Sequence, residues 1–265
     1  MHTAIKISNR LTALFETKKE SLLNIYFTAG YPALNDTVTI LKALQKAGVD
    51  MVEIGMPYSD PVADGPIIQK SSQEAIENGM TIKNLLQQLK DIRKEVTIPI
   101  LLMGYFNPVM QYGVEKFIKE ISEIGIDSVI VPDLPLSEYI EHYQHLFESH
   151  NISNISLITP NTKDERIVLI DEISQGFIYM VSTNSTTGNE QKKSEENHLT
   201  YFNHIRSMGL KSPRMIGFNI KDKNTFSNAC SYANGAIIGS AFIQMLSNSH
   251  LLEQDIIQFV KNIRG

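Results

Sequence analysis

The sequence alternates between short apolar runs and longer helix-like segments along nearly its whole length. Eight of these runs are rich in Val, Ile, Leu and Met, as expected of strands that are buried on both faces. The expected strands are Leu22–Thr28, Val49–Ile54, Ile98–Met103, Asp127–Val131, Ile155–Ile158, Phe177–Val181, Met215–Phe218 and Ala236–Ile238. The segments between them show apolar residues at helical spacing. Crossover helices therefore join successive strands, and the predicted sheet is parallel.

Eight strands alternating with helices match a closed (β/α)8 barrel, and 265 residues is the usual size of one such barrel. No stretch resembles a linker, so residues 1–265 are expected to form a single domain. Residues 1–20 precede the first strand and contain an amphipathic helix, which is expected to cover the bottom of the barrel. The predicted fold class is α/β, a TIM barrel with an extra N-terminal helix.

Composition and charge argue against several classes of protein. The formal net charge is -5 and no long run carries one sign, so the basic patch typical of nucleic-acid binding is missing. No apolar run approaches the roughly 18 residues of a membrane span, and the first residues lack a signal-peptide core. Cys230 is the only cysteine, which excludes an internal disulfide. We expect a cytoplasmic protein.

One acidic residue interrupts the second apolar run. Glu53 stands between Val52 and Ile54, where an ionised carboxylate is costly unless something pairs with it. One interpretation is a structural ion pair inside the barrel. The other is a general acid or base whose pKa is raised by burial, because burial disfavours the charged form. Its place at the C-terminal end of a strand favours catalysis, since barrel enzymes keep their active sites at that edge.

Two more acids, Asp60 and Asp64, lie in the loop that follows this strand. Asp beside Pro and Gly is ordinary in a solvated turn. Carboxylates also suit Mg²⁺, but no His or further acid completes a recognisable ligand spacing, so no metal site is expected. The residues alone leave the turn and the functional interpretations open.

Glycines follow the last three expected strands, at Gly188, Gly217 and Gly239, and Ser240 comes directly after the last of them. Late loops of a barrel, together with the N-terminus of a short helix, commonly bind a phosphate group. Glycine lets a ligand approach the backbone closely, and the helix dipole favours an anion. The segment G-A-I-I-G-S at 235–240, after G-F-N-I at 217–220, therefore predicts a phosphate site.

Motifs spread over essentially the whole chain resemble those of the tryptophan synthase alpha chain family. They are E-I-G-M-P-Y-S-D-P-V-A-D-G-P at 53–66, F-T-A-G-Y-P at 27–32, M-G-Y-F-N-P at 103–108, V-P-D-L-P at 131–135, G-F-I-Y-M-V at 176–181, T-T-G at 186–188 and G-A-I-I-G-S at 235–240. The resemblance implies a lyase of tryptophan biosynthesis that cleaves indole-3-glycerol phosphate to indole and glyceraldehyde 3-phosphate. It also implies an alpha2beta2 complex, in which a beta chain with pyridoxal phosphate receives the indole, and no cofactor in this chain.

The resemblance also assigns roles to residues. Glu53 and Asp64 are the implied catalytic pair, and Asp64 accepts a hydrogen bond from the indole N–H. The implied substrate-binding residues are Tyr26, Met103, Ile130, Tyr179, Thr187 and Phe218. The implied phosphate-binding residues are Gly188, Asn219, Gly239 and Ser240. By position alone, most of the strand-end side chains fit barrel core equally well.

The chain departs from the family pattern at two positions. Thr183 stands where the family usually has Arg, and Asn219 replaces a glycine whose N–H contacts the phosphate. Asn tolerates left-handed backbone better than other non-glycine residues, so this N–H could keep its place. The loops 57–65 and 182–197 are expected to close together, with Thr187 hydrogen-bonded to Asp64.

Two other functions remain as alternatives. One is a Schiff-base aldolase on the same barrel, with a lysine such as Lys221 as nucleophile. The other is a non-catalytic subunit that only activates a beta chain. The presence of both Glu53 and Asp64 argues against the second alternative.

Overall fold

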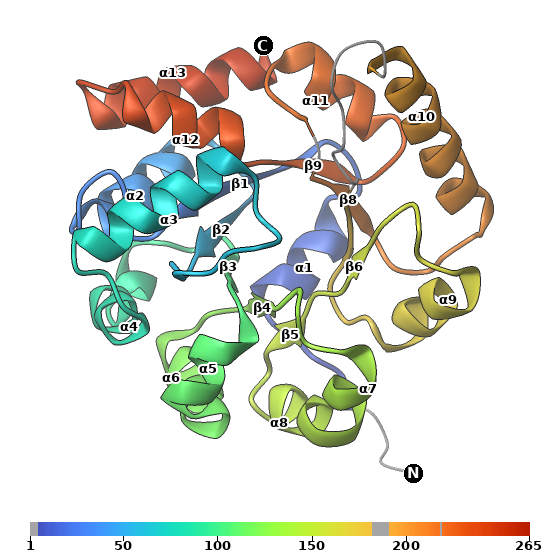
Figure 1. Ribbon diagram of the computed structural model, residues 1–265, viewed down its shortest axis with the longest axis horizontal. Helices are drawn as coiled ribbons and strands as arrows, with labels where there is room; N and C mark the ends of the chain where they lie inside the picture. Colours follow the sequence, from blue (N-terminus) through green and yellow to red (C-terminus); the bar gives the residue numbers. More distant parts are fainter. Residues whose placement is uncertain (1–4, 182–190, 218) are drawn as a thin grey trace.

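The computed structural model describes residues 5–181, 191–217 and 219–265, with the backbone alone for 191–197. Within these ranges nine parallel strands form one sheet in the order β5-β4-β3-β2-β1-β9-β8-β7-β6. The strands are β1 (Leu22–Thr28), β2 (Met51–Gly55), β3 (Ile100–Met103), β4 (Ser128–Ile130), β5 (Ser153–Asn154), β6 (Leu157–Ile158), β7 (Ile178–Met180), β8 (Arg214–Ile216) and β9 (Gly235–Ile238). Figure 1 shows them curled into a ring with most helices outside it.

The two strands at the ends of this order, β5 and β6, are the halves of one barrel strand. The first half pairs with β4 and the second half with β7. Between them, Ile155 N–H donates to Val129 O at 3.0 Å, and Tyr179 N–H donates to Ser156 O at 3.0 Å. The sheet therefore closes on itself through this segment, and the predicted eight-stranded barrel is confirmed.

The helices alternate with the strands, as the sequence predicts. They are α1 (Arg10–Thr17), α2 (Asp36–Ala47), α3 (Pro66–Glu77), α4 (Ile82–Leu89), α5 (Phe106–Tyr112), α6 (Val114–Ile124), α7 (Leu136–Glu138), α8 (Gln144–Ser149), α9 (Asp164–Ile173), α10 (Gln191–Ser207), α11 (Lys223–Cys230), α12 (Ser240–Ser247) and α13 (Leu252–Arg264), with short turns η1 (Ile92–Lys94) and η2 (Tyr139–Tyr143). Gly48 and Gly125 end α2 and α6 in the left-handed conformation that favours glycine. In the described chain no helix has the length and apolar character needed to span a membrane.

The start of α10 was predicted wrongly. The polar stretch 182–197 is expected as a loop and the next helix from about Leu199, but α10 already begins at Gln191. The sequence Q-K-K-S-E-E at 191–196 lacks an apolar stripe, yet Gln, Lys and Glu have high intrinsic helix propensity. Local backbone preference therefore accounts for the early start of the helix.

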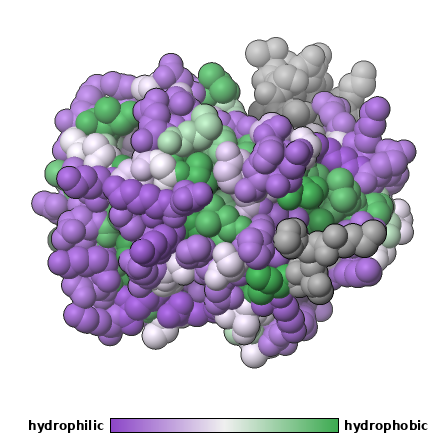
Figure 2. All heavy atoms as spheres, turned by 90° about the horizontal axis from the view of Figure 1, so that it is seen from below, coloured by the Kyte–Doolittle hydropathy of each residue, from purple (hydrophilic) through white to green (hydrophobic). Residues whose placement is uncertain are grey.

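Helix α1 lies across the N-terminal end of the barrel (Figure 1). Asn9 caps it, accepting from the N–H groups of Leu11 and Thr12, and its Nδ2 donates to Asp127 O at 2.7 Å. Leu11 is completely buried and belongs to one core that continues to Ile263 near the C-terminus. From this shared core we infer a single domain over residues 1–265. Figure 2 shows that hydrophilic residues dominate one outer face and that hydrophobic residues appear there as separate patches.

Asp127 joins four elements at the bottom of the barrel. Its side chain is 1% exposed and pairs with Arg93 at 2.5 Å and with Arg10 at 3.3 Å. It also accepts from the backbone N–H of Arg10 and of Ile100. These contacts tie α1 and η1 to the starts of β3 and β4. Only 14% of the Arg93 side chain is exposed, and this desolvation lowers the pKa of its guanidinium to about 10.

We expect Asp127→Ala to destabilise the fold strongly, because the half-buried Arg93 guanidinium would lose its anion. Loss of one partner of a buried ion pair typically costs about 3–5 kcal/mol. Urea denaturation measures the change in unfolding free energy. Asp91→Ala is the control, because the Asp91–Lys94 pair lies on the surface, with 57% and 76% of the two side chains exposed. Equal stability of the two variants would contradict the assigned role of Asp127.

Candidate functional site

Glu53 lies on β2 and is completely buried. The parallel register places it opposite Tyr26 on β1 and Leu101 on β3. Asn24 Nδ2 donates to Glu53 Oε2 at 3.0 Å. The other carboxylate oxygen, Oε1, has no hydrogen-bond partner among the described residues. No cation pairs with Glu53 in this part of the chain, so the geometry does not support the structural ion pair considered from the sequence.

The surroundings of Glu53 favour its protonated form. Burial raises the pKa of its carboxyl from the ordinary 4.5 to about 8, the Asn24 hydrogen bond lowers it in part, and the charge of Asp64 raises it further. A carboxyl group with this pKa holds its proton in most molecules at neutral pH. Such a group can act as a general acid and, after giving up the proton, as a base.

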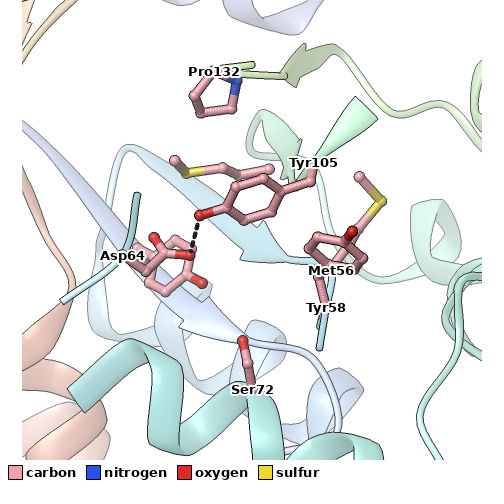
Figure 3. A pocket seen from close by; sticks show the side chains of 9 residues that line it. Met56, Tyr58, Asp64, Ser72, Tyr105 and Pro132 are labelled. Carbon is pink, nitrogen blue, oxygen red and sulfur yellow. Dashed lines mark hydrogen bonds between the residues drawn. The ribbon is translucent and has the colours of Figure 1, made fainter. Parts of the chain in front are cut away.

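Asp64 lies in the loop between β2 and α3. Tyr105 donates its hydroxyl to Asp64 Oδ2 at 3.0 Å, and the N–H of Ala63 donates to that same hydroxyl at 3.0 Å. The Tyr58 ring lies 5.2 Å from the Tyr105 ring, centroid to centroid. Figure 3 shows the Tyr105 hydroxyl directed at the Asp64 carboxylate. Burial raises the pKa of Asp64, and the Tyr105 hydrogen bond opposes that rise.

Asp64 faces a pocket at the C-terminal end of the barrel strands. Its lining residues are Tyr26, Met56, Tyr58, Asp64, Ser72, Met103, Gly104, Tyr105 and Pro132 (Figure 3). The pocket thus combines one carboxylate with several aromatic and thioether side chains. Such a lining suits a flat apolar ring that carries one polar hydrogen.

The structure places the other predicted substrate-binding residues at different depths. Tyr26 and Met103 line the pocket. Tyr179 is buried on β7, and Glu53 and Tyr26 are among the groups that raise the pKa of its hydroxyl, so it belongs to the same cluster. Ile130 is completely buried at the end of β4 and does not line the pocket. Thr187 and Phe218 lie outside the described residues.

Two glycines make room for the buried tyrosines. A Cβ atom on Gly55 would overlap the Tyr26 hydroxyl, and one on Gly217 would overlap the Tyr179 ring. Gly217 was grouped with the phosphate-site glycines on sequence grounds. Its observed contact instead is with the aromatic ring beside Glu53.

The structure describes three of the four predicted phosphate-binding residues, Gly239, Ser240 and Asn219. Gly239 is the N-cap of α12 and Ser240 its first residue, so the helix end that leaves N–H groups without helical partners begins beside Tyr26, which Gly239 adjoins. Asn219 has φ +50°, the left-handed backbone expected from its replacement of a glycine. Gly188 lies outside the described residues, as does Thr183.

Two alternative chemistries find no support in this geometry. Lys221, considered for a Schiff base, is exposed and does not line the pocket. Among the residues described, no group of three or more His, Cys, Asp or Glu is arranged to hold a metal ion.

Asn24 and Tyr105 were not singled out as partners of the two acids. Asn24 is a polar residue in the apolar first strand and stands two positions before Tyr26, on the same face by strand alternation. That alternation could have revealed it. The contact between Tyr105 and Asp64 joins two loops, and no local pattern signals it.

Comparison with known proteins identifies the family. The profile of the tryptophan synthase alpha chain matches residues 12–264. The tryptophan synthase alpha chain of Flavobacterium psychrophilum is 52% identical over 255 residues, which are 96% of this chain and 99% of the relative. That of Christiangramia forsetii is 53% identical over 244 residues, 92% of this chain and 94% of the relative.

Solved structures agree with the sequence comparison. The tryptophan synthase alpha chain of Legionella pneumophila superposes with a TM-score of 0.84 at 29% identity, covering 97% of this chain and 96% of that one. A chain of tryptophan synthase from M. tuberculosis, in an aminoacrylate-bound form, gives a TM-score of 0.84 at 25% identity, covering 97% and 98%. The resemblance first seen in the motifs is thereby confirmed, and the chain belongs to the tryptophan synthase alpha chain family.

Proposed function

We propose that Glu53 and Asp64 carry the alpha reaction of tryptophan synthase, the retro-aldol cleavage of indole-3-glycerol phosphate to indole and glyceraldehyde 3-phosphate. The observation that carries this assignment is a fully buried carboxyl with a pKa of about 8, close to a second carboxylate that faces an aromatic pocket. The reaction needs a proton donor that can then act as a base, which suits Glu53, and an ionised carboxylate that stabilises the cationic ring, which suits Asp64.

The proton movements balance around Glu53. Protonated Glu53 gives its proton to C3 of the indole ring, and the ring nitrogen becomes part of a positively charged iminium. The Asp64 carboxylate accepts the indole N–H and stabilises that charge. Glu53, now ionised, takes the proton of the side-chain hydroxyl while the carbon–carbon bond breaks and its electrons return to the ring. Indole and the aldehyde leave, and Glu53 is protonated again.

The iminium formed on the substrate is the electron sink of this step. The reaction in this chain therefore requires neither a Schiff-base lysine nor a cofactor, and pyridoxal phosphate is assigned to the partner. The chain works with a tryptophan synthase beta chain. We place the alpha2beta2 complex in the cytoplasm.

We assign the indole ring of the substrate to the Asp64 pocket, with Tyr26, Met103 and Tyr179 around it and with Ile130 packed behind. The phosphate group is assigned to the first turn of α12, at Gly239 and Ser240, and to the N–H of Asn219. The left-handed backbone of Asn219 and the position of the α12 N-terminus beside Tyr26 support this orientation. Thr187, Gly188 and Phe218 remain sequence-based members of the same site.

Glu53→Gln is expected to lower kcat by roughly 10²–10⁴-fold, the usual contribution of general acid–base catalysis, while the fold is retained. Turnover of indole-3-glycerol phosphate with the beta chain present measures the loss. Glu148→Gln is a matched control, because Glu148 is a buried acid on α8 that accepts from the N–H of Ile5 and does not line the pocket. A Glu53→Gln enzyme with more than half of wild-type turnover would refute the assignment.

The stability of the protein should depend on pH through Glu53. Between pH 4.5 and about 8 the unfolded chain has released this proton while the folded chain keeps it, so the Glu53 contribution to folding becomes less favourable as pH rises. The total loss is on the order of 5 kcal/mol, from about 1.4 kcal/mol for each pH unit of the shift. Urea denaturation should show Glu53→Gln gaining stability relative to wild type from pH 5 to 8. A constant difference across this range would contradict the raised pKa.

Tyr105→Phe removes the hydroxyl that donates to the Asp64 carboxylate, so Asp64 should be held less firmly in place. It also removes the acceptor of the Ala63 N–H. Loss of a hydrogen bond to a charged group predicts a fall in kcat/KM of roughly tenfold or more. Without this bond the pKa of Asp64 rises, so the acidic limb of the pH–rate profile should move to higher pH. Tyr112→Phe is the control, because that hydroxyl donates to Glu120 at 2.5 Å between α5 and α6, and not to Asp64. If the pH–rate profiles of Tyr105→Phe and Tyr112→Phe coincide, the assigned role of the Tyr105 hydroxyl is contradicted.

A further inference from the structure

Asn24 is a buried polar side chain on β1 that contacts the catalytic acid. Its side chain is completely buried on β1, and the only hydrogen bond it forms within the described residues is the one from Nδ2 to Glu53 Oε2. Its amide oxygen has no partner there. A buried amide with an unsatisfied oxygen is less favourable for folding than an apolar side chain of similar size. Asn24 is therefore a poor choice for stability alone.

The same pair leaves one oxygen of Glu53 free. Oε2 accepts from Asn24, whereas Oε1 is buried without a partner in the described part of the chain. Since a hydrogen bond from an amide occupies an acceptor oxygen, the proton of the neutral acid belongs on Oε1. Oε2 thus anchors the carboxyl to Asn24, and Oε1 carries the proton.

The other groups near Glu53 cannot replace Asn24. Asp64 in the β2–α3 loop is the charged group that acts on Glu53, while the charge of Glu53 acts in turn on the Tyr26 hydroxyl on β1 and the Tyr179 hydroxyl on β7. Asp64 disfavours the ionised form of Glu53, and burial keeps both tyrosines protonated to high pH. Among the residues that the structure describes, Asn24 is the one neighbour that stabilises the Glu53 carboxylate.

We propose that Asn24 is the positioning residue of the catalytic acid: its amide holds Glu53 Oε2, so that Oε1 gives the proton to the substrate and takes the next one back. This inference rests on the proposed function of Glu53. The amide donates to Oε2 in both protonation states, so the carboxyl keeps one orientation through the cycle. Asn24 itself exchanges no proton and does not line the substrate pocket.

Asn24→Leu is the test, because leucine has a similar size and no hydrogen-bonding group. We expect kcat to fall roughly ten- to hundredfold, as for a misplaced catalytic group, with little change in KM. The Glu53 carboxyl loses a bond that favours its charged form, so its titration should move up by roughly one pH unit. The basic limb of the pH–rate profile should move with it, since the protonated acid starts the reaction.

The Glu53 titration is read directly from the carboxyl C=O band in the infrared spectrum, identified by its loss in Glu53→Gln. Thr37→Val is the matched control: it removes another buried hydrogen bond, from Gly30 N–H at 3.0 Å, without touching Glu53. We expect the control to keep both the wild-type titration and the wild-type basic limb. An Asn24→Leu variant whose Glu53 band titrates as in wild type would overturn the proposal. So would a shifted titration with unchanged kcat and an unchanged basic limb.

The proposed function has its own test in the turnover of Glu53→Gln, so the two failures are distinguishable. If Glu53→Gln is inactive while Asn24→Leu keeps the wild-type kcat and the wild-type Glu53 titration, the role of Asn24 is refuted and the role of Glu53 stands. If Asn24→Leu does not fold, the wild-type protein still gives an answer. The Asn24 side-chain ¹⁵N–¹H signals should then shift with the midpoint of the Glu53 titration and lose that dependence in Glu53→Gln. Asn24 side-chain signals that do not shift at the midpoint of the Glu53 titration would refute the proposal.

Discussion

Closure of the hydrogen-bonded ring is the constraint on which the rest of the molecule depends. The barrel closes where one segment, from Ser153 to Ile158, pairs with β4 by its first half and with β7 by its second half. Because every strand is parallel, closure brings all C-terminal strand ends to one rim. Glu53 on β2, Tyr179 on β7 and the first turn of α12 after β9 meet there, although they are far apart in the sequence.

The closed ring also sets the electrostatics of the site. Inside the barrel, water cannot solvate the Glu53 carboxyl, and the residues described provide one amide and no cation to compensate. Folding around an ionised Glu53 is therefore unfavourable, and the core that closes the ring offsets this cost. Asp64, the second acid, lies at the mouth of the barrel. Burial raises its pKa, but the hydrogen bond from the Tyr105 hydroxyl opposes that rise. Two carboxyls of similar intrinsic acidity thereby become suited to different tasks.

The sequence predicted what local periodicity encodes. Buried parallel strands have a near-continuous apolar pattern, so the eight strands could be counted, and a carboxylate inside one of them stood out at Glu53. The left-handed Asn219 followed from the resemblance, in which a glycine holds this position, together with the tolerance of Asn for that backbone. The early start of α10 was missed because hydrophobic pattern was weighted above helix propensity. The contact between Tyr105 and Asp64 depends on how two loops meet, and nothing in either loop alone encodes it.

The clearance that Gly55 and Gly217 give to Tyr26 and Tyr179 has a consequence for how sequences of this kind can diverge. Each glycine touches the tyrosine of a neighbouring strand, so a side chain gained at the glycine requires a smaller residue in place of the tyrosine. Each glycine is thus free to change only when its tyrosine changes too. Among related chains they should appear as covarying pairs, and a lone substitution of either glycine should be rare even where the surrounding strand has drifted.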